Sequence, residues 1–251
     1  VPYTGMRTLA SAAFMDKTVT KRLLSGQDIP QLDCVALHRP ADGVMMSGAA
    51  LAEVVGNAKL PACVKPCHLG SSIGVAKVDD MEQLREVLPS IFRLDPVAIV
   101  EPFVTNLVEY NVSVSRFGGE IRTSAIERPK RASELLDFKE KYMSGGGGKK
   151  GGTKSPGAAS EGMLSLTRDI NPDIPAELEA NIRKWASAAF EAVGGTGAPR
   201  IDFLGDEETG EIWLNEVNPC PGSFGYFLWE AADPPILFTE LLSKLIEEAV
   251  E

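Results

Sequence analysis

The spacing of hydrophobic residues along the chain predicts several amphipathic helices. Apolar side chains recur every three or four positions over residues 8–24, 49–57, 80–88, 176–193 and 234–250. Asp80 is expected to cap the third of these helices, which should end before Pro89 because proline has no N–H for the helix interior. Gly194 and Gly195 are expected to end the fourth.

Shorter apolar runs of period two predict strands between these helices. They cover residues 97–103, 108–116, 120–126, 199–204 and 211–217, and residues 63–78 read as two strands around a glycine-containing turn. Several neighbouring strands are joined by short turns, so hairpins are frequent. This pattern predicts an α+β fold with mixed or antiparallel sheets, and no Walker A or G-x-G-x-x-G motif follows a strand.

Composition narrows the classes of function. Hydrophobic residues make up 44% of the 251 residues, and the formal net charge of −10 argues against nucleic acid as the main partner. The sequence has no apolar run of membrane-spanning length and no secretory signal, which favours a cytoplasmic protein with reduced thiols. Cys63 and Cys67 have no second cysteine pair to complete a zinc site, and His38 and His68 lie in no metal or nucleophile motif.

The predicted hairpin near the C-terminus carries the most specific chemistry. Arg200 and Asp202 share one face of its first strand, as Glu216 and Asn218 do on the second, because side chains alternate with period two. Three oxygen ligands on adjacent strands suit Mg²⁺, and the arginine can stabilise charge on a phosphoryl or acyl group. The alternative is a solvent-facing hairpin that carries these charges by chance.

Two further features are weak when taken alone. Lys65 precedes the segment 70–74, Gly-Ser-Ser-Ile-Gly, whose backbone N–H groups can bind phosphate oxygens, although a plain hairpin turn would look the same. Glu101 at a strand end and Glu109 on the next strand can accept hydrogen bonds from adenine and ribose, although two surface glutamates would also fit.

Taken in order, these segments resemble the D-alanine–D-alanine ligase family of the ATP-grasp superfamily. The matching segments are Met15-Asp16-Lys17, Val64-Lys65-Pro66, Gly70-Ser71-Ser72-Ile73-Gly74-Val75, Glu101-Pro102-Phe103, Lys141-Tyr142, Arg200-Ile201-Asp202-Phe203, Asn215-Glu216-Val217-Asn218 and Pro221-Gly222. The resemblance implies an ATP-grasp fold with a smaller nucleotide-binding lobe at residues 1–105 and a larger lobe at 106–251. A mobile glycine-rich loop at residues 144–162 would belong to the larger lobe.

The resemblance also implies a role for each matching residue. Lys17 and Lys65 would contact the phosphates, and Gly70, Ser71 and Ser72 would form a lid over them. Glu101, Phe103 and Glu109 would contact the adenosine. Two Mg²⁺ ions, or Mn²⁺, would be bound by Asp202, Glu216 and Asn218. Lys141 and Tyr142 would close the site, while Arg200 and the Gly222 amide would steady an oxyanion. The implied reaction joins two amino acids through an acyl phosphate for peptidoglycan synthesis, in a protein that could be a homodimer.

Three departures from the family pattern limit this interpretation. The N-terminal domain that the family normally carries is expected to be missing, and the loop at residues 144–162 is longer than usual, with lysines that could serve only solubility. Phe227 stands where the family has a serine for the second amino acid. An acceptor other than D-alanine, or an ATP-binding module without turnover, therefore stays open.

Overall fold

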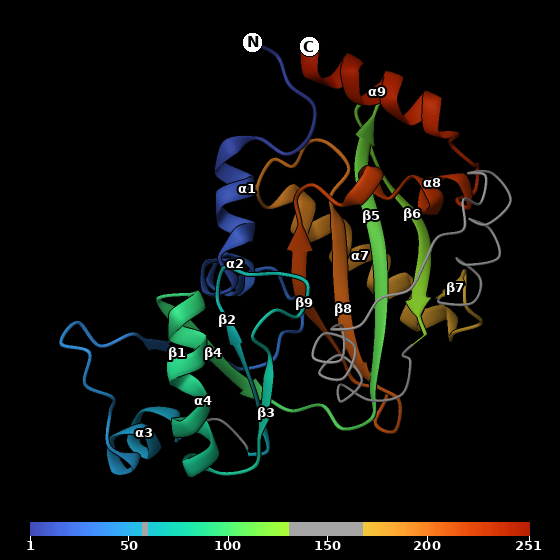
Figure 1. Cartoon of the computed structure of the whole chain (residues 1–251). Coiled ribbons are helices and arrows are strands. Elements are labelled where there is room, and N and C mark those ends of the chain that lie inside the picture. The colour runs from blue at the N-terminus through green and yellow to red at the C-terminus, as the bar shows by residue number, and fades with distance from the viewer. Residues whose placement is uncertain (57–59, 131–167) are drawn as a thin grey trace, which may run out of the picture.

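The computed structural model describes residues 1–56, 60–130 and 168–251, and contains two antiparallel sheets (Figure 1). The first sheet has the strand order β1–β4–β2–β3. Its elements are β1 (Val35–His38), α3 (Gly48–Val55), β2 (Ala62–Pro66), β3 (Ala76–Val78), α4 (Met81–Leu94) and β4 (Val97–Pro102). Leu51 and Val55 of α3 and Leu88 of α4 form one buried cluster with Val64 and Val100, so both helices cover the same face.

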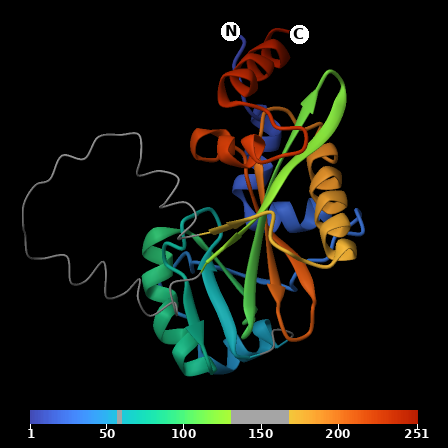
Figure 2. The same cartoon turned by 90° about the vertical axis from the view of Figure 1, so that its right-hand side faces the viewer.

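The second sheet has the order β7–β6–β5–β8–β9. Its strands are β5 (Leu107–Phe117), β6 (Glu120–Pro129), β7 (Arg168–Ile170), β8 (Arg200–Asp206) and β9 (Ile212–Asn218). Helix α7 (Ala176–Glu191) lies on one face and the short α8 (Tyr226–Glu230) on the other (Figure 2), while α9 (Phe238–Val250) packs beside α8. Helices and two antiparallel sheets confirm the predicted α+β class.

The predicted helix over residues 8–24 is wrong in one respect, because the structure has two helices there. These are α1 (Thr8–Met15) and α2 (Lys17–Leu24), separated by an extended Asp16 with φ −107° and ψ 110°. The Asp16 carboxylate accepts hydrogen bonds from the backbone N–H groups of Thr18 and Val19. It therefore caps α2, and the cap competes with continuation of α1.

Both N-terminal helices pack against the second sheet. Phe14 of α1 and Leu24 of α2 belong to the buried cluster that contains Phe203 and Leu214. The predicted division into lobes 1–105 and 106–251 assigns α1 and α2 to the first lobe, although they share a core with the sheet of the second. The division itself stays a prediction.

Helix α4 does not end before Pro89 as expected, but continues to Leu94. Pro89 lies on the exposed side, whereas Leu88 and Ile91 on either side of it are buried. Proline cannot donate the backbone hydrogen bond at this position, and packing of the apolar face therefore stabilises the helix through Pro89. Strands β1 and β7 and helix α8 were not expected from the sequence, and the C-terminal helix begins at Phe238, four residues after the predicted start at Pro234.

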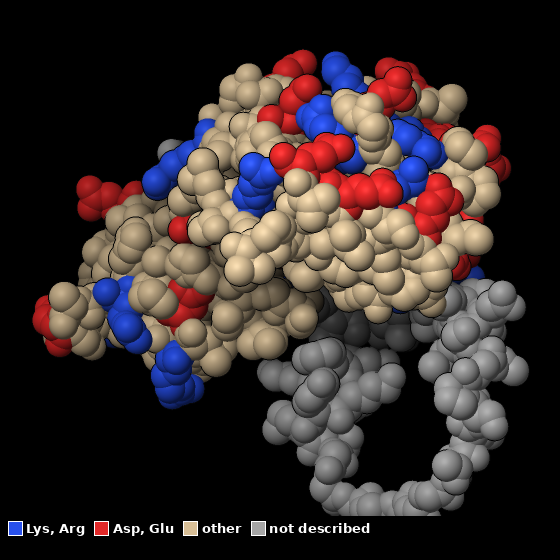
Figure 3. All heavy atoms as spheres, turned by 90° about the horizontal axis from the view of Figure 1, so that it is seen from above, with Lys and Arg blue, Asp and Glu red and all other residues tan. Residues whose placement is uncertain are grey.

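The surface mixes both signs of charge. Seen from above, lysine and arginine side chains alternate with aspartate and glutamate side chains around α9 (Figure 3). Lys244 and Glu240 of this helix form one such pair, at 3.5 Å. Within the part of the chain that the structure describes, no helix combines the length and the apolar character needed to cross a bilayer.

Candidate functional site

A cleft between the two sheets gathers most of the predicted site residues. One hollow lies against the first sheet, and an adjoining hollow shares Ser72, Glu109 and Glu216 with it. A concave site with a few convergent polar groups is the usual form of a small-molecule site. Between them the two hollows are lined by Lys17, Lys65, Gly70, Ser71, Ser72, Glu101, Phe103, Glu109, Arg200, Asp202, Glu216 and Asn218.

Three predicted features are not among these lining residues. Lys141, Tyr142 and the glycine-rich loop at residues 144–162 fall outside the described residues. Gly222 is exposed at the start of a 3₁₀ turn, η1 (Gly222–Gly225), and lines neither hollow.

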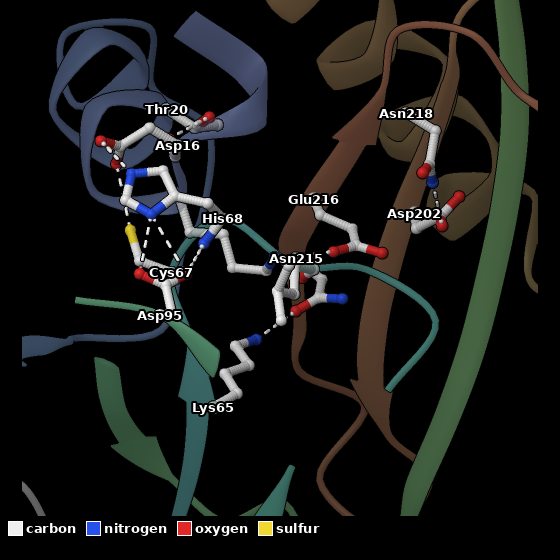
Figure 4. Close-up of polar contacts among 12 residues, drawn as sticks. Asp16, Thr20, Lys65, Cys67, His68, Asp95, Asp202, Asn215, Glu216 and Asn218 are labelled. Carbon is white, nitrogen blue, oxygen red and sulfur yellow. Dashed lines mark hydrogen bonds and ion pairs between the residues drawn. The ribbon is translucent and has the colours of Figure 1, made fainter. Parts of the chain in front are cut away.

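The β8–β9 hairpin supplies the acidic side of the cleft. Asp202 pairs with Glu216 across the two strands, and Arg200 with Asn218, so all four side chains share one face. The Arg200 guanidinium donates to both oxygens of Asp202, at 2.7 Å each. Asn218 Nδ2 donates to Asp202 Oδ2 at 2.8 Å (Figure 4). The predicted cluster of one carboxylate pair, one amide and one arginine is thus assembled in the structure.

The ligand chemistry around Asp202 fits a bound cation. Burial raises the pKa of Asp202 to about 6, even though Arg200 lies against it, and the negative charges of Glu216 and Glu127 add to the effect. A divalent cation held by Asp202, Glu216 and the Asn218 amide oxygen would oppose this shift, and these are oxygen ligands that Mg²⁺ prefers.

The opposite wall presents buried lysines. Lys65 and Glu101 lie on one face of the first sheet, because Cys63 pairs with Glu101 and Lys65 sits two residues further on. Lys65 Nζ is 2.7 Å from Glu101 Oε2, and Lys21 Nζ is 2.8 Å from Oε1 of the same carboxylate. Burial opposes ionisation of Lys65 and Glu101, but their pairing outweighs burial, so the pKa of Lys65 is raised and that of Glu101 is lowered.

This pairing adds a structural role to Glu101, whose predicted contact with adenine stays a prediction. Only 2% of the residue is exposed, and each carboxylate oxygen already accepts from an ammonium group. Two lysines and one glutamate leave a net positive charge under the glycine-serine turn. Lys21 was missed from the sequence, where it looked like one more polar residue on an amphipathic helix.

Two lysines link the two walls of the cleft. Lys17 Nζ donates to the Leu69 carbonyl at 2.7 Å and lies 3.3 Å from Glu216 Oε2. Lys65 Nζ donates to Asn215 Oδ1 at 2.9 Å. Both ammonium groups therefore stand between the glycine-serine turn and the acidic hairpin, where phosphate oxygens would meet positive charge from one side and a metal from the other.

The glycine-serine turn is held in an unusual backbone conformation. Ser71 and Ser72 have φ values of 54° and 55°, in the left-handed region, and both are exposed. Gly74 follows with φ 74°, and an added Cβ there would lie 2.8 Å from Leu94 Cδ1. Strained turns of this kind concentrate at ligand-binding segments, because the surrounding packing must maintain them.

The segment after the hairpin places Phe227 on α8, half-buried beneath Arg168. The Arg168 guanidinium carbon lies 4.8 Å from the ring centre, and the same guanidinium donates to Glu127 Oε2 at 2.8 Å. Glu127 is 2% exposed and also accepts from Asn111. Neither Arg168 nor Glu127 was expected from the sequence, because they lie on strand ends with no recognisable motif.

Comparisons with known proteins identify the family of this chain. The family model described as D-ala D-ala ligase C-terminus matches residues 23–247. D-alanine–D-alanine ligases of Heliobacterium modesticaldum and Thermosipho africanus are 33% and 32% identical, over 98% and 100% of this chain and 62% of their own length. The chain thus spans under two thirds of these relatives.

Solved structures show the same fold. A VanG D-Ala:D-Ser ligase from Enterococcus faecalis superposes with a TM-score of 0.75 at 26% identity, covering 99% of this chain and 65% of that one. The D-alanine–D-alanine ligase from Coxiella burnetii gives 0.74 at 23% identity, with 100% and 60% covered, and supports the fold alone. The predicted ATP-grasp architecture is confirmed, and the chain belongs to the D-alanine–D-alanine ligase family, matching its C-terminal part.

Proposed function

We propose that this chain carries the ATP-binding and catalytic cleft of a ligase that joins the carboxylate of one amino acid to the amine of another. The observation that carries the proposal is the meeting of Lys17 and Lys65 with Asp202, Glu216 and Asn218 in one cleft. Buried ammonium groups opposite a metal-binding set are what transfer of a phosphoryl group from ATP requires.

The proposed reaction has two steps. A carboxylate oxygen of the first amino acid attacks the γ-phosphorus of ATP, the bond to the β-phosphate oxygen breaks, and ADP leaves. The amine of the second amino acid then attacks the carbonyl carbon of the acyl phosphate, and inorganic phosphate leaves with the C–O bonding pair as the nitrogen loses its proton. Water must be kept away from the acyl phosphate between these steps.

The described residues divide the work. Lys17 and Lys65 bind phosphate oxygens, and the turn that carries Ser71 and Ser72 covers them. Arg200 uses two donor groups on Asp202 and has further N–H groups for a developing oxyanion. Asp202, Glu216 and Asn218 would hold Mg²⁺, or Mn²⁺ in its place, which neutralises charge on the phosphates when bound.

The first amino acid is best taken as D-alanine, from the names of the relatives. The acceptor is less constrained, because Phe227 has no hydrogen-bond donor and lies under Arg168. A neighbour named as a D-Ala:D-Ser ligase supports the view that this fold admits more than one acceptor. If D-alanine is the acceptor, we place the activity in cytoplasmic synthesis of peptidoglycan precursors.

The test is release of phosphate from ATP and Mg²⁺ with and without D-alanine, with products identified by mass spectrometry and D-serine and other D-amino acids tried as acceptors. The Asp202→Asn variant should lose activity by about 100-fold or more, whereas Glu240→Gln on the exposed face of α9 should not. A binding module without turnover would instead bind ATP, release no phosphate with any amino acid, and respond to neither substitution.

A further inference from the structure

A second cluster of metal-binding side chains lies beside the cleft, where the junction of α1 and α2 meets the end of β2 (Figure 4). It consists of Asp16, Cys67 and His68. Cys67 Sγ is 3.2 Å from Asp16 Oδ1, and His68 Nε2 is 3.2 Å from Asp16 Oδ2. One ligand atom from each residue can be chosen so that all three lie within 4.8 Å of one another.

We propose that Asp16, Cys67 and His68 form a binding site for a borderline-soft divalent cation, with Zn²⁺ as the best fit. Zn–N and Zn–O bonds of about 2.0–2.1 Å and a Zn–S bond of about 2.3 Å place tetrahedral ligand atoms about 3.3–3.5 Å apart. The two contacts of Asp16, at 3.2 Å from Oδ1 to the thiol and 3.2 Å from Oδ2 to Nε2, are close to these edges, and the thiol and Nε2 lie within 4.8 Å of each other. The site uses none of the residues assigned to ATP or Mg²⁺.

The outer contacts of His68 match those of a zinc ligand. Its Nδ1 faces the Asp95 carboxylate at 2.9 Å, and its backbone N–H donates to the same carboxylate at 2.7 Å. Asp95 is 3% exposed and also accepts from the Val97 N–H. A carboxylate on Nδ1 holds the imidazole with Nε2 toward the metal and makes that nitrogen a stronger ligand.

The other two ligands are also fixed in advance. The Oδ1 atom of Asp16 accepts from Thr18 N at 2.8 Å and Val19 N at 3.0 Å, which orients its carboxylate. The backbone of Cys67 donates to the Val97 carbonyl at 3.0 Å and accepts from the Lys17 N–H at 3.3 Å. Little side-chain freedom remains to be lost when an ion binds.

Protons compete with a metal ion for two of these ligands. Burial raises the pKa of Cys67, and hydrogen bonds and charge from Asp95 and Asp16 outweigh burial to raise the pKa of His68. Because a metal ion binds the thiolate and the neutral imidazole, binding should tighten as pH rises.

The ligand chemistry separates this site from the Mg²⁺ site. A thiolate and an imidazole favour Zn²⁺ or Co²⁺, whereas Mg²⁺ prefers the all-oxygen set of the β8–β9 hairpin. The half-exposed ring of His68 leaves a side open for the ion to enter and for a water as fourth ligand. The neighbouring Lys17 ammonium turns away, to the Leu69 carbonyl and Glu216.

The experiment titrates the full 251-residue chain with Co²⁺ in the absence of nucleotide. Cobalt bound to a thiolate gives an intense sulfur-to-metal absorption band and visible bands of tetrahedral coordination. Zn²⁺ should bleach both at one equivalent, and a large excess of Mg²⁺ should not. Cys67→Ser should abolish the sulfur band, and Asp95→Asn should weaken binding about 10- to 100-fold. Cys220→Ser and His38→Asn are the matched controls and should change nothing.

A further variant guards against loss of folding. With Cys34, Cys63 and Cys220 all replaced by serine, Cys67 is the sole thiol, and the sulfur band must remain. The proposal is overturned if the wild-type chain gives no sulfur band at saturating Co²⁺, or if the band survives Cys67→Ser. Neither result depends on ATP turnover, so this test and that of the ligase activity can fail separately.

Discussion

Replacement of Glu101 by glutamine should destabilise the chain strongly, although the two side chains have the same shape. Glu101 is 2% exposed and is the shared partner of Lys21 and Lys65, at 2.8 and 2.7 Å. Removing one partner from a buried ion pair typically costs about 3–5 kcal/mol, because the remaining charge is left without compensation. We expect Glu101→Gln to lower the free energy of unfolding at pH 7 by about 3 kcal/mol or more.

The measurement is urea denaturation at pH 7, followed by circular dichroism, with Glu240→Gln as the matched control. Glu240 pairs with Lys244 on the surface of α9, at 3.5 Å and with both side chains partly exposed. Such a pair contributes about 0–1 kcal/mol. Replacing Lys21 by methionine in the Glu101→Gln background should recover part of the loss, because one uncompensated ammonium disappears.

Acid should erase the difference between wild type and Glu101→Gln. The pKa of Glu101 is lowered in the folded chain, since the two lysines outweigh burial. Its contribution is therefore complete above the unfolded pKa of about 4.3 and is lost as pH falls through the folded value. Equal losses in Glu101→Gln and Glu240→Gln at pH 7 would refute the idea that a buried charge network supports this wall of the cleft.

Two more substitutions test other parts of the site. Gly74→Ala should destabilise the chain more than Gly118→Ala, by about 1 kcal/mol or more. Both glycines have positive φ, but only at Gly74 would an added Cβ meet a neighbour, Leu94 Cδ1 at 2.8 Å. The test is to compare the thermal unfolding of the two variants. With a chelator present, the raised pKa of His68 means that its protonated form stabilises the folded chain. This contribution is complete below the unfolded pKa of about 6.5 and is lost as pH rises through the folded value. His68→Asn should therefore lower the free energy of unfolding more at low pH than at high pH. The free energy of unfolding measured at several pH values tests this, and a difference between wild type and variant that does not change with pH would contradict it.

Local sequence patterns predicted many of the helices and strands and several residues of the cleft. The β8–β9 hairpin was predictable because Arg200, Asp202, Glu216 and Asn218 alternate with buried residues, and alternation alone decides the face of a strand. The break at Asp16 was not, because an aspartate that caps a new helix and one on the surface of a continuous helix have the same local sequence. Individual contacts between distant segments, such as Lys21 with Glu101, could not be predicted from local patterns.

The zinc-type cluster illustrates the last point. Asp16 and Cys67 are 51 positions apart, and contacts such as the backbone bond from Lys17 to the Cys67 carbonyl bring them together. A search for spaced cysteines and histidines cannot find such a set. The same holds for Lys21 and Glu101, whose pairing depends on where the fold places α2 beside the first sheet.

The two sheets are held together mainly by polar contacts, and this bears on catalysis. The buried cluster around α3 and α4 and the one around α7 are separate sets of residues. Between the first sheet and the body formed by the second sheet with α1 and α2, Lys17 meets the Leu69 carbonyl and Lys65 meets Asn215. Rotation of one sheet relative to the other would thus break a few polar contacts and leave both apolar cores intact, at far lower cost than unfolding either core. A reaction that must admit ATP and then exclude water needs such a low-cost motion, and the polar side chains that would permit it are the ones proposed to bind the phosphates.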